Sequence, residues 1–424
     1  MTDNHLSDLR FDTLELDETL HEGIRDAGFE FCTPIQANAL PVALANSDVA
    51  GQAQTGTGKT AAFLIAAFQR ILTLGTDATK GGQRQPRIFV LAPTRELAIQ
   101  IGKDAEDLAK HTGLTIALAF GGTDYEKQRR HIEGGIDMLV GTPGRIIDYF
   151  KQGVFKLSEI EVVILDEADR MFDLGFIKDI RYLLRRLPDP DKRLNMLFSA
   201  TLSQRVLELA YEHMNEPELI RIEPEKMTVD RVRQAIFFPS NEEKLPLLVG
   251  LIREMGEGRV MVFVNTKREA ERIEAYLQAN EINASAISGD VPQKKRMRML
   301  TQFQEGELAV LIGTDVASRG LHIPDVQCVI NYDLPNDKED YVHRIGRTAR
   351  AGAAGDAISF GCETYVMSLP DIESYIGHKI PVANHDPGLL PKLIKPAPRR
   401  NRSHAGKPRT GGRSSRPPSR RPRR

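Results

Sequence analysis

The sequence predicts an α/β protein of two lobes, each built on a mostly parallel sheet that helices cover. Short apolar runs alternate with longer amphipathic stretches, a pattern typical of parallel strands buried between helices. The pattern occurs twice along the 424 residues. A chain of this length is also too long for a single core, so we assign one lobe to each occurrence.

The strands follow from short runs rich in Val, Ile, Leu and Phe. In the first lobe they are expected at 87–91, 115–120, 137–140, 162–165 and 195–198. In the second lobe they are expected at 234–238, 260–264, 284–287, 308–312, 327–331 and 357–360. One helix is expected at 95–110, where a single stripe carries Leu97, Ile101, Ala105 and Leu108.

The boundary between the lobes is expected at 223–229, where Pro224 and charged residues interrupt the periodicity. The predicted organisation is an N-terminal segment at 1–38, a first lobe at 39–222, a second lobe at 223–391 and a tail at 392–424. The tail holds thirteen Lys/Arg and no Asp/Glu, which leaves 44 basic and 58 acidic residues, a net charge of −14, before it. Because it has few large apolar residues to offset its ordering entropy, we expect this basic tail to be disordered.

Cysteine usage and hydropathy indicate the expected compartment. Cys32, Cys328 and Cys362 are scattered and form neither a CxxC pair nor a zinc-like cluster. This favours a reduced, cytoplasmic protein without a structural metal. The polar, acidic N-terminus predicts no secretory signal. No apolar run reaches the roughly 18 residues that a membrane-spanning helix needs, so no membrane partner is expected.

Residues 53–60 predict a phosphate-binding loop. Glycines let backbone N–H groups approach phosphates, Lys59 reaches the β- and γ-oxygens, and the Thr60 hydroxyl ligates Mg²⁺. A small residue, Ala53, stands where the general pattern has Gly, and a Gly-rich turn before a helix is the alternative. The expected ligands are ATP and Mg²⁺. The ATP-binding residues of the loop are Ala53, Gln54, Thr55, Gly56, Thr57, Gly58, Lys59 and Thr60.

An acidic tetrapeptide, residues 166–169, follows the strand expected at 162–165. At the carboxyl edge of a parallel sheet, where ligands bind, Asp166 suits a Mg²⁺ partner. Glu167 is placed to orient or deprotonate the attacking water. The alternative for such a tetrapeptide is a solvated helix start, but its place at a strand end favours the catalytic interpretation.

Upstream of the loop, Phe11, Thr33 and Gln36 are candidates for contact with adenine. A Gln amide both donates and accepts, which suits the N6/N7 edge of the base, and Phe11 could stack on it. A capped helix start is the alternative interpretation for residues 33–36.

In the second lobe, residues 343–350 carry arginines at 344, 347 and 350. Arg347 and Arg350 lie about one turn apart if this segment is helical, so both could point into one cleft. Arginine is always charged and binds phosphate in a bidentate manner, so we assign both to catalysis. A basic surface helix is the alternative.

Taken together, these motifs resemble the DEAD-box RNA helicase family, over about residues 9–365 and in family order. The matching segments are the Gln36 motif, 53–60, 93–98, 121–122, 142–145, 166–169, 199–201, 262–267, 293–296, 314–320 and 343–350. Two positions depart from the family pattern. Ala349 replaces a usual Gly, which a helix tolerates, and His322 replaces an Asp that contacts ribose.

The resemblance implies two RecA-like lobes that close on ATP and single-stranded RNA. It places Gly320 with the ATP-binding residues. It implies that RNA, held mostly by its backbone, contacts Pro93, Thr94, Arg95, Gly122, Thr142, Arg145, Arg296 and Thr314. It implies coupling between the lobes through Asp169, Ser199, Thr201 and His343. For the turn at 199–201, simple helix capping is the alternative.

The predicted function is ATP-dependent, non-processive unwinding of short RNA duplexes, in which closure bends one strand. Two alternatives stay open: an ATP-gated RNA clamp without productive unwinding, and a motor directed to DNA, because no residue reads a 2′-OH directly. Segments 175–188, 193–203, 239–244 and 375–381 resemble one bacterial branch of the family. That branch implies a role in mRNA degradation, with the RNase E-type endoribonuclease scaffold of the degradosome as partner.

Overall fold

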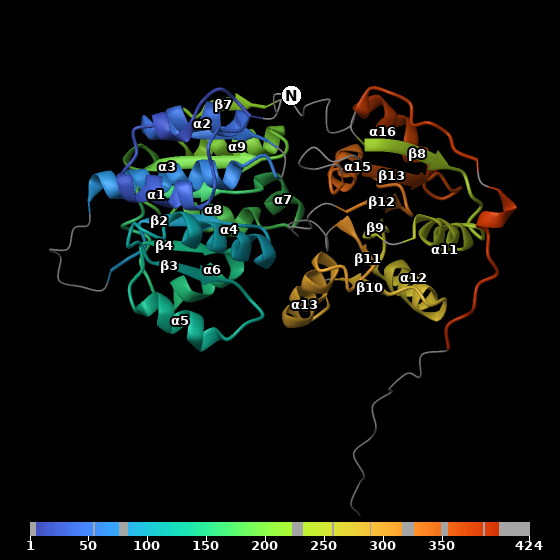
Figure 1. Ribbon diagram of the computed structural model, residues 1–424. Helices are drawn as coiled ribbons and strands as arrows, with labels where there is room; N and C mark the ends of the chain where they lie inside the picture. Colours follow the sequence, from blue (N-terminus) through green and yellow to red (C-terminus); the bar gives the residue numbers. More distant parts are fainter. Residues whose placement is uncertain are drawn as a thin grey trace, which may run out of the picture.

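The computed structural model describes residues 6–53, 56–75, 84–222, 232–256, 258–288, 290–315, 326–348, 355–384 and 386–397. Several predictions fall elsewhere in the chain and so lie outside the described residues: those for Gln54, Thr55, Gly320, His322, Ala349, Arg350, the boundary at 223–229 and most of the tail. The described residues form two α/β lobes side by side (Figure 1).

The first lobe contains a seven-stranded parallel sheet in the order β3-β4-β2-β5-β6-β1-β7. Its strands are β1 (Val49–Gln52), β2 (Ile88–Leu91), β3 (Ile116–Ala119), β4 (Met138–Gly141), β5 (Val162–Leu165), β6 (Leu194–Ser199) and β7 (Glu218–Arg221). The central strands are buried throughout, which explains why they are almost wholly apolar.

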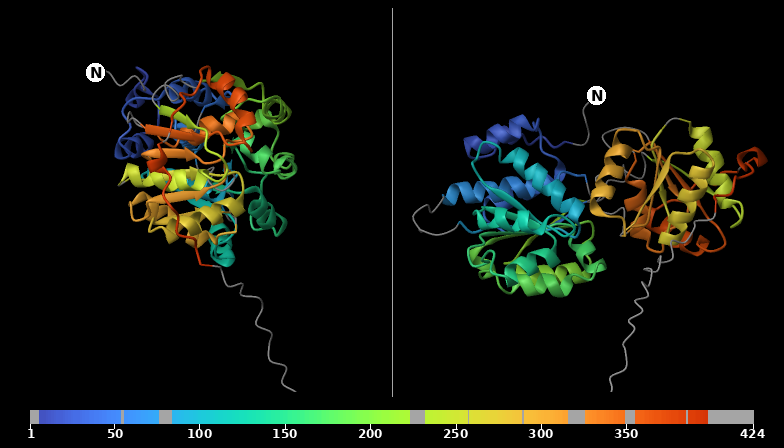
Figure 2. Two further views of the ribbon diagram at one scale, coloured as in Figure 1. Left: turned by 90° about the vertical axis from the view of Figure 1, so that its right-hand side faces the viewer. Right: turned by 90° about the horizontal axis from the view of Figure 1, so that it is seen from below.

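Two helical layers cover this sheet (Figure 2). One face packs against α1 (Glu18–Asp26), α2 (Pro34–Leu44), α3 (Lys59–Leu74) and α4 (Arg95–Leu108). The other packs against α5 (Tyr125–Glu133), α6 (Pro143–Lys151), α7 (Ala168–Asp173), α8 (Ile177–Leu184) and α9 (Gln204–His213). Two 3₁₀ turns, η1 (Phe11–Thr13) and η2 (Pro190–Lys192), complete the lobe. Alternate residues of one strand enter opposite cores, as Val90 and Leu91 do, because side chains alternate across a strand.

The second lobe contains a six-stranded parallel sheet in the order β10-β11-β9-β12-β13-β8. Its strands are β8 (Val232–Phe237), β9 (Val260–Phe263), β10 (Ala284–Ile287), β11 (Val310–Gly313), β12 (Cys328–Asn331) and β13 (Gly355–Phe360). Its helices are α11 (Lys244–Met255), α12 (Lys267–Ala279), α13 (Gln293–Gln304), α15 (Lys338–Ile345) and α16 (Leu369–Ile376), with 3₁₀ turns η3 (Val366–Ser368) and η4 (Pro387–Leu389).

The segment 386–397 runs along the outside of the second lobe beside α11 and α12. Asn280, at the end of α12, exchanges two hydrogen bonds with the Ile394 backbone, at 3.0 Å each. Gly250 in α11 lets this segment approach closely, because a Cβ there would lie 2.0 Å from the Leu389 carbonyl oxygen. The chain therefore reaches the predicted tail from a fixed point on the second lobe.

The predicted fold class is confirmed: both lobes are parallel sheets covered by helices. All eleven predicted strands overlap observed ones. β1 and β7 were missed, because the first is only four residues with a Gly and a Gln, and the second is a short edge strand with charged ends. Within the described residues, no helix is both long and apolar enough to cross a membrane.

Candidate functional site

The carboxyl ends of three neighbouring strands form the centre of the candidate site. β1, β6 and β5 are adjacent and parallel, so the residues after them lie at one edge of the sheet. Ala53 follows β1 and Asp166 follows β5, while Ser199 ends β6 between them. The Ala53 N–H donates to the Ser199 carbonyl at 3.0 Å. This edge is where open α/β sheets bind ligands, and it brings the phosphate loop beside the acidic residues.

The described part of the phosphate loop, Gly56 to Thr60, leads directly into α3, which begins at Lys59. Gly56 and Gly58 both adopt φ +88°, in the left-handed region that favours glycine. Lys59 donates from Nζ to the Ala53 carbonyl at 2.8 Å, and the same Nζ lies 4.0 Å from Asp166 Oδ1. The ammonium is thus held between the loop and the acidic residues.

Asp166 and Glu167 are both buried, but their pKa values move in opposite directions. Burial raises the pKa of Asp166 to about 6, against the opposing charge of Lys59. Burial also disfavours ionised Glu167, but the charges of Arg170, Lys59 and Arg347 outweigh it and lower the pKa of this carboxyl. Glu167 also adopts φ +53°, a strained conformation of the kind that gathers at functional sites.

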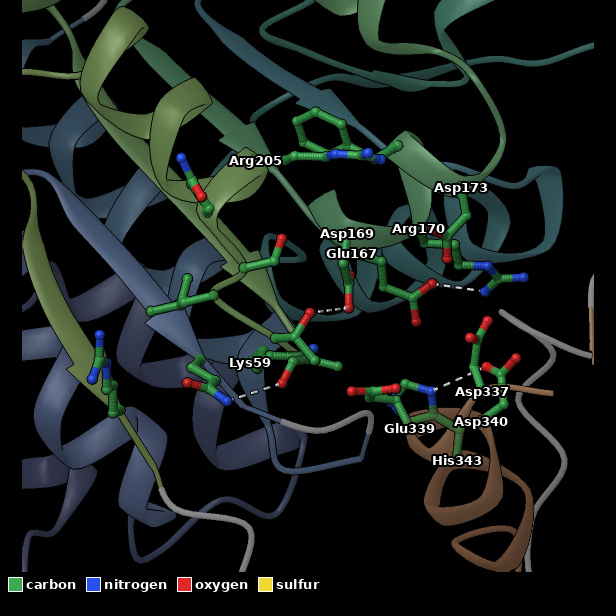
Figure 3. A pocket seen from close by; sticks show the side chains of 18 of the residues that line it. Lys59, Glu167, Asp169, Arg170, Asp173, Arg205, Asp337, Glu339, Asp340 and His343 are labelled. Carbon is green, nitrogen blue, oxygen red and sulfur yellow. Dashed lines mark hydrogen bonds and ion pairs between the residues drawn. The ribbon is translucent and has the colours of Figure 1, made fainter. Parts of the chain in front are cut away.

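Arg170 is a partner of Glu167 that the sequence analysis did not single out. Its Nη1 donates to Glu167 Oε2 at 2.8 Å, and both side chains are almost fully buried (Figure 3). The two residues are three positions apart at the start of α7, a spacing that brings side chains onto one helix face. That spacing was the available sequence signal.

Thr33 and Gln36 begin α2 and contact the phosphate loop. Gln36 accepts the Thr33 N–H through Oε1 at 2.8 Å and donates from Nε2 to the Gly58 carbonyl at 3.0 Å. The capped helix start is therefore present, and the amide uses its donor and acceptor for the helix and the loop. The contact is close, because a Cβ on Gly58 would lie 2.5 Å from Gln36 Nε2.

The structure places different aromatic side chains at this cavity from the one chosen from sequence. Phe11 is 2% exposed, belongs to the core of the first lobe and stacks on Phe29 with ring centroids 5.8 Å apart. It does not line the cavity beside the phosphate loop, whereas Phe29 and Phe31 do. The sequence offers three Phe residues within 21 positions, and only packing decides which of them faces the loop.

Two cavities meet at the catalytic residues. A cavity of about 1030 Å³ includes Thr33, Gln36, the phosphate loop and Asp166. A second cavity, of about 990 Å³, is lined by both lobes. The residues common to both are Lys59 and Glu167. The chemistry expected of these two residues therefore falls where the nucleotide cavity opens into the space between the lobes.

The interlobe cavity is lined by three of the residues expected to couple the lobes, Asp169, Thr201 and His343, and Ser199 lies behind Asp169. The Asp169 N–H donates to Ser199 Oγ at 3.1 Å, and Thr201 Oγ1 lies 3.5 Å from Asp169 Oδ2. Ser199 and Thr201 thus support the first turn of α7, whereas Ser203 is the N-cap position of α9. Across the cavity lies His343 on α15, whose Nδ1 is 3.9 Å from Asp340 Oδ1 (Figure 3).

The helical expectation for the arginine segment is wrong at Arg347. α15 ends at Ile345 and Gly346 is its C-cap residue, so Arg347 lies just beyond the helix. It is nonetheless buried and lines the interlobe cavity with Lys59 and Glu167. The glycine at 346 was the sequence signal for this helix end.

Arg344, the first arginine of that segment, has a different position. It is 1% exposed and forms two 2.6 Å bonds to the Asp315 carboxylate. It also donates to the Asp333 carbonyl at 2.6 Å and to Asn265 Oδ1 at 2.9 Å. Because Asp315 follows Thr314, this buried arginine links the Thr314 segment to the helix that precedes Arg347.

On the first lobe, the residues expected along the RNA path lie at the starts of α4 and α6 and in the turn between β3 and α5. Thr94 caps α4 by accepting a backbone N–H of its first turn at 3.3 Å, directly after the buried Pro93. Arg95 packs on the turn that contains Gly122 at φ +84°, since a Cβ at Gly121 would lie 3.1 Å from Arg95 Nη2. These residues therefore form one continuous surface.

Two more candidates on the same lobe lie at the start of α6. Thr142 occupies its N-cap position, and Arg145 lies in its first turn. The Arg145 guanidinium lies over two aromatic rings, 4.8 Å from the centroid of Tyr125 and 5.4 Å from that of Tyr149. Neither tyrosine was singled out from the sequence.

The second lobe meets this surface through an ion pair between lobes. Arg296 on α13 lies with Nη2 3.1 Å from Glu96 Oε1 on α4, and both side chains are largely buried. Thr314 follows β11 at the carboxyl edge of its sheet. Glu96 was not singled out, because its role depends on a contact between residues 200 positions apart.

Family models match both lobes. Residues 33–209 match the DEAD/DEAH box helicase model, and residues 243–352 match the helicase conserved C-terminal domain. The chain is 55% identical over 416 residues to the ATP-dependent RNA helicase RhlB of Shewanella halifaxensis, covering 98% of this chain and 94% of the relative. The chain belongs to the DEAD/DEAH box helicase family. It is an ATP-dependent RNA helicase of the DEAD-box type and binds ATP.

Other relatives support this assignment. The helicase is 57% identical to RhlB of Pasteurella multocida, over 93% of each chain, and 56% identical to RhlB of Idiomarina loihiensis, over 99% of each chain. The bacterial branch indicated by the sequence is therefore RhlB.

Solved structures confirm the RecA-like helicase fold. Dbp5 of S. cerevisiae bound to RNA and ADP BeF3 superposes with a TM-score of 0.78 at 32% identity, covering 88% of the helicase and 95% of Dbp5. Mss116p bound to ssRNA and AMP-PNP gives 0.77 at 26% identity, covering 90% and 81%. Both similarities extend over the two lobes together.

Proposed function

We propose that this helicase separates short RNA duplexes locally, by closing its two lobes on ATP and single-stranded RNA. The observation that carries the proposal is the interlobe cavity, where Lys59 and Glu167 of the first lobe meet Arg347 of the second. In the first lobe, Lys59 is the cation proposed to bind the transferred phosphoryl group, while Arg170 binds Glu167. Hydrolysis would then depend on the closed arrangement of the lobes, which is what couples ATP to RNA.

The nucleotide would occupy the cavity beside the phosphate loop, with the adenine toward Gln36 and the phosphates on Gly58, Lys59 and Thr60. Mg²⁺ fits this site, because the buried Asp166 carboxyl and the Thr60 hydroxyl offer oxygen ligands beside the phosphate loop. Asp166, partly through water, and the Thr60 hydroxyl would hold the ion. When bound, Mg²⁺ would neutralise charge on the phosphates.

Glu167 is the group proposed to orient and deprotonate the attacking water. Its lowered pKa keeps it ionised, and the Arg170 contact fixes its direction. Arg347, with Arg350, would stabilise charge that develops on the phosphoryl group, a contribution of about 10³–10⁵ in rate for arginine fingers. The chain's own residues thus supply base, charge stabilisation and orientation from two lobes.

RNA would lie across the opposite side of the cleft, on the starts of α4 and α6 and on α13. Helix N-termini favour phosphate, and Arg95, Arg145 and Arg296 add positive charge. Contacts of this kind hold the backbone without reading bases, so sequence preference should be weak. Relatives solved with RNA support this path: the Dbp5 and Mss116p structures carry RNA and a nucleotide analogue.

The cycle would proceed by closure and release. ATP and RNA bring the lobes together, the bound strand bends, and a bent strand no longer fits an A-form duplex. Hydrolysis removes the contact between the γ-phosphate and Arg347, the cleft opens and RNA leaves. Asp169, Ser199, Thr201 and His343 are proposed to transmit this change, because Asp169, Thr201 and His343 line the interlobe cavity and Ser199 holds the Asp169 N–H.

The decisive test combines a trapped variant with a strand-displacement assay. Glu167→Gln should bind ATP and RNA normally but turn over more than 100-fold more slowly, because the base is lost and the shape is kept. Normal turnover would contradict the catalytic assignment. If the wild type hydrolyses ATP in the presence of RNA but does not separate a short duplex, the result would instead indicate an RNA clamp.

RNA preference needs its own comparison. ATPase activity should rise with single-stranded RNA and much less with DNA of the same length and sequence. Equal stimulation would support the DNA-directed alternative, since no described side chain identifies a 2′-OH contact.

We further propose a cytoplasmic role in mRNA degradation. The support is similarity to RhlB along almost the whole chain. An RNase E-type endoribonuclease scaffold is the proposed partner, with docking on the second lobe. Co-purification of the full chain with such a scaffold is the direct test, and failure to associate at micromolar concentration would contradict this part alone.

A further inference from the structure

The turn between β3 and α5, together with α6, holds Arg145 in a fixed position. Tyr125 is the first residue of α5 and its ring lies 4.8 Å from the Arg145 guanidinium carbon. Tyr149, one turn along α6 from Arg145, lies 5.4 Å from the same carbon. Because the faces of aromatic rings carry negative potential, both contacts attract the cation.

Hydrogen bonds lock this arrangement. The Arg145 Nη1 donates to Tyr149 Oη at 3.2 Å, and that hydroxyl donates to the Tyr125 carbonyl at 2.8 Å. The two rings are 4.8 Å apart, and Tyr125 Oη accepts from Gln152 Nε2. Tyr149 is fully buried, so it cannot contact RNA itself. Its hydroxyl instead bonds both Arg145 and the Tyr125 carbonyl.

A flexible arginine loses rotamer freedom when it binds a phosphate, and this loss weakens binding. A guanidinium already fixed between two tyrosines has lost most of that freedom before RNA arrives. The remaining N–H groups of Arg145 are then held in one place, on a residue of the first turn of α6.

We propose that Tyr125 and Tyr149 are positioning residues that pre-organise Arg145 for the RNA backbone. This rests on the proposed function, in which Arg145 contacts phosphate. The tyrosines strengthen RNA binding without contributing charge. Their removal therefore affects the affinity, and removal of Arg145 affects both the affinity and its salt dependence.

A double-mutant cycle tests the proposal. Affinity for a fluorescent ten-nucleotide oligo-U would be measured by anisotropy over a salt series, with a non-hydrolysable ATP analogue present. Tyr125→Leu should weaken binding by about 3- to 10-fold at every salt concentration, as expected for a lost cation–π contact. The slope against salt should stay unchanged, because the positive charge remains.

The reference variant is Arg145→Ala, which should reduce the slope by about 0.7, the value for one phosphate contact on a single strand. In that background Tyr125→Leu should cost nothing further. Tyr125→Phe should restore wild-type affinity, since it keeps the ring. Tyr211→Leu, at a 61% exposed tyrosine on α9, is the matched control.

An equal loss from Tyr125→Leu with and without Arg145 would overturn the proposal, because the tyrosine would then act independently. So would an unchanged affinity in Tyr125→Leu when Arg145→Ala weakens binding. If Arg145→Ala itself leaves affinity and slope unchanged, the RNA path proposed at Arg145 fails, and the positioning role fails with it. Melting curves for each variant separate these results from unfolding.

Discussion

The nucleotide side and the RNA side of the cleft are built from different kinds of contact. On the nucleotide side, Lys59, Asp166 and Glu167 are almost fully buried and stand within one connected set of charges. On the RNA side, Thr94, Arg95, Thr142 and Arg145 are half-buried and lie at separate helix starts. The nucleotide side is therefore a compact site of coupled charges, and the RNA side is a row of separate contacts.

This difference predicts how substitutions should behave. In a buried, coupled set, removing one charge leaves its partners without compensation, so effects should be large and non-additive. Along a row of half-exposed phosphate contacts, each residue should contribute a small, salt-dependent and nearly additive amount. Exceptions are expected where the RNA side becomes buried or where the nucleotide side becomes exposed.

The largest effect is expected from Arg347→Ala. Arg347 is the described second-lobe cation that both lines the interlobe cavity and acts on the pKa of Glu167. Its loss should lower the kcat of RNA-stimulated ATP hydrolysis by about 10³ with little change in ATP binding, because the interaction is made mainly in the transition state. Single-turnover hydrolysis and nucleotide titration measure the two quantities.

Arg205→Ala is the matched control, because Arg205 lines the same cavity but is exposed. It should change kcat by less than threefold. If both variants lose activity equally, the cavity acts through general positive charge, and the contrast between buried and exposed cations does not hold.

The second-largest effect is expected from deletion of residues 398–424. The predicted tail carries most of the positive charge that compensates an acidic body. Cutting after residue 397 keeps the Ile394 contacts to Asn280 and so leaves the described second lobe intact. RNA affinity at low salt should fall about 10- to 100-fold and the salt slope should flatten, while ATPase without RNA stays nearly constant.

Binding isotherms over a salt series check this expectation. A tail that acts on RNA must lose its effect at high salt, where the wild type and the deletion should converge. An unchanged slope would assign the tail to a protein partner or to no role.

The third prediction concerns the ion pair between the lobes, a charged part of the RNA side that is largely buried. Glu96→Gln removes the negative charge that faces Arg296 Nη2 at 3.1 Å across the lobes. The RNA concentration that half-activates ATPase should rise about tenfold, equivalent to about 1.4 kcal/mol, because breaking such a pair destabilises only the closed state. At saturating RNA, kcat should be close to normal.

Charge exchange distinguishes this pair from ordinary RNA contacts. Glu96→Arg combined with Arg296→Glu should recover part of the loss that either change produces alone. Additive losses in the double variant would mean that Arg296 acts on RNA alone, as the family resemblance implies.

The sequence was sufficient for the fold class and for naming a candidate nucleotide loop, because both depend on local order. Apolar runs at strand spacing predicted the sheets, and the spacing of Gly58, Lys59 and Thr60 carries the phosphate chemistry in consecutive residues. The acidic pair Asp166 and Glu167 was found for the same reason, since it follows directly after a recognisable strand.

Contacts between distant segments could not be predicted in this way. Glu96 meets Arg296 only when two lobes come together. Arg344 meets Asp315 only because β11 and β12 flank β9 in the sheet and α15 packs against β12. Phe11 illustrates the same limit, since its burial depends on the turn that brings Phe29 beside it. Helix ends were only partly predictable. Gly346 signals the end of α15, but the spacing of the arginines led to the prediction of a helix through Arg347.

The smallest effect is expected at Asp104, on the half-exposed rim of the nucleotide cavity. Burial, with some contribution from Asp107, raises its pKa from the ordinary value of 3.8 to about 6. The folded protein therefore binds a proton more tightly than the unfolded chain between these two values. Stability falls as pH rises through that window and stays low above it.

Asp104→Asn removes this penalty and should stabilise the protein above pH 6. Linkage gives an upper bound of about 3 kcal/mol, which partial solvent access reduces to about 1 kcal/mol. The gain in unfolding free energy should therefore be larger at pH 7.5 than at pH 5, as urea unfolding at both values would show. Asp107→Asn, at an exposed position of the same helix, should give a smaller gain, because it removes only the repulsion and leaves Asp104 buried. An equal gain from Asp104→Asn at both pH values would mean that removal of the side-chain charge is not the cause.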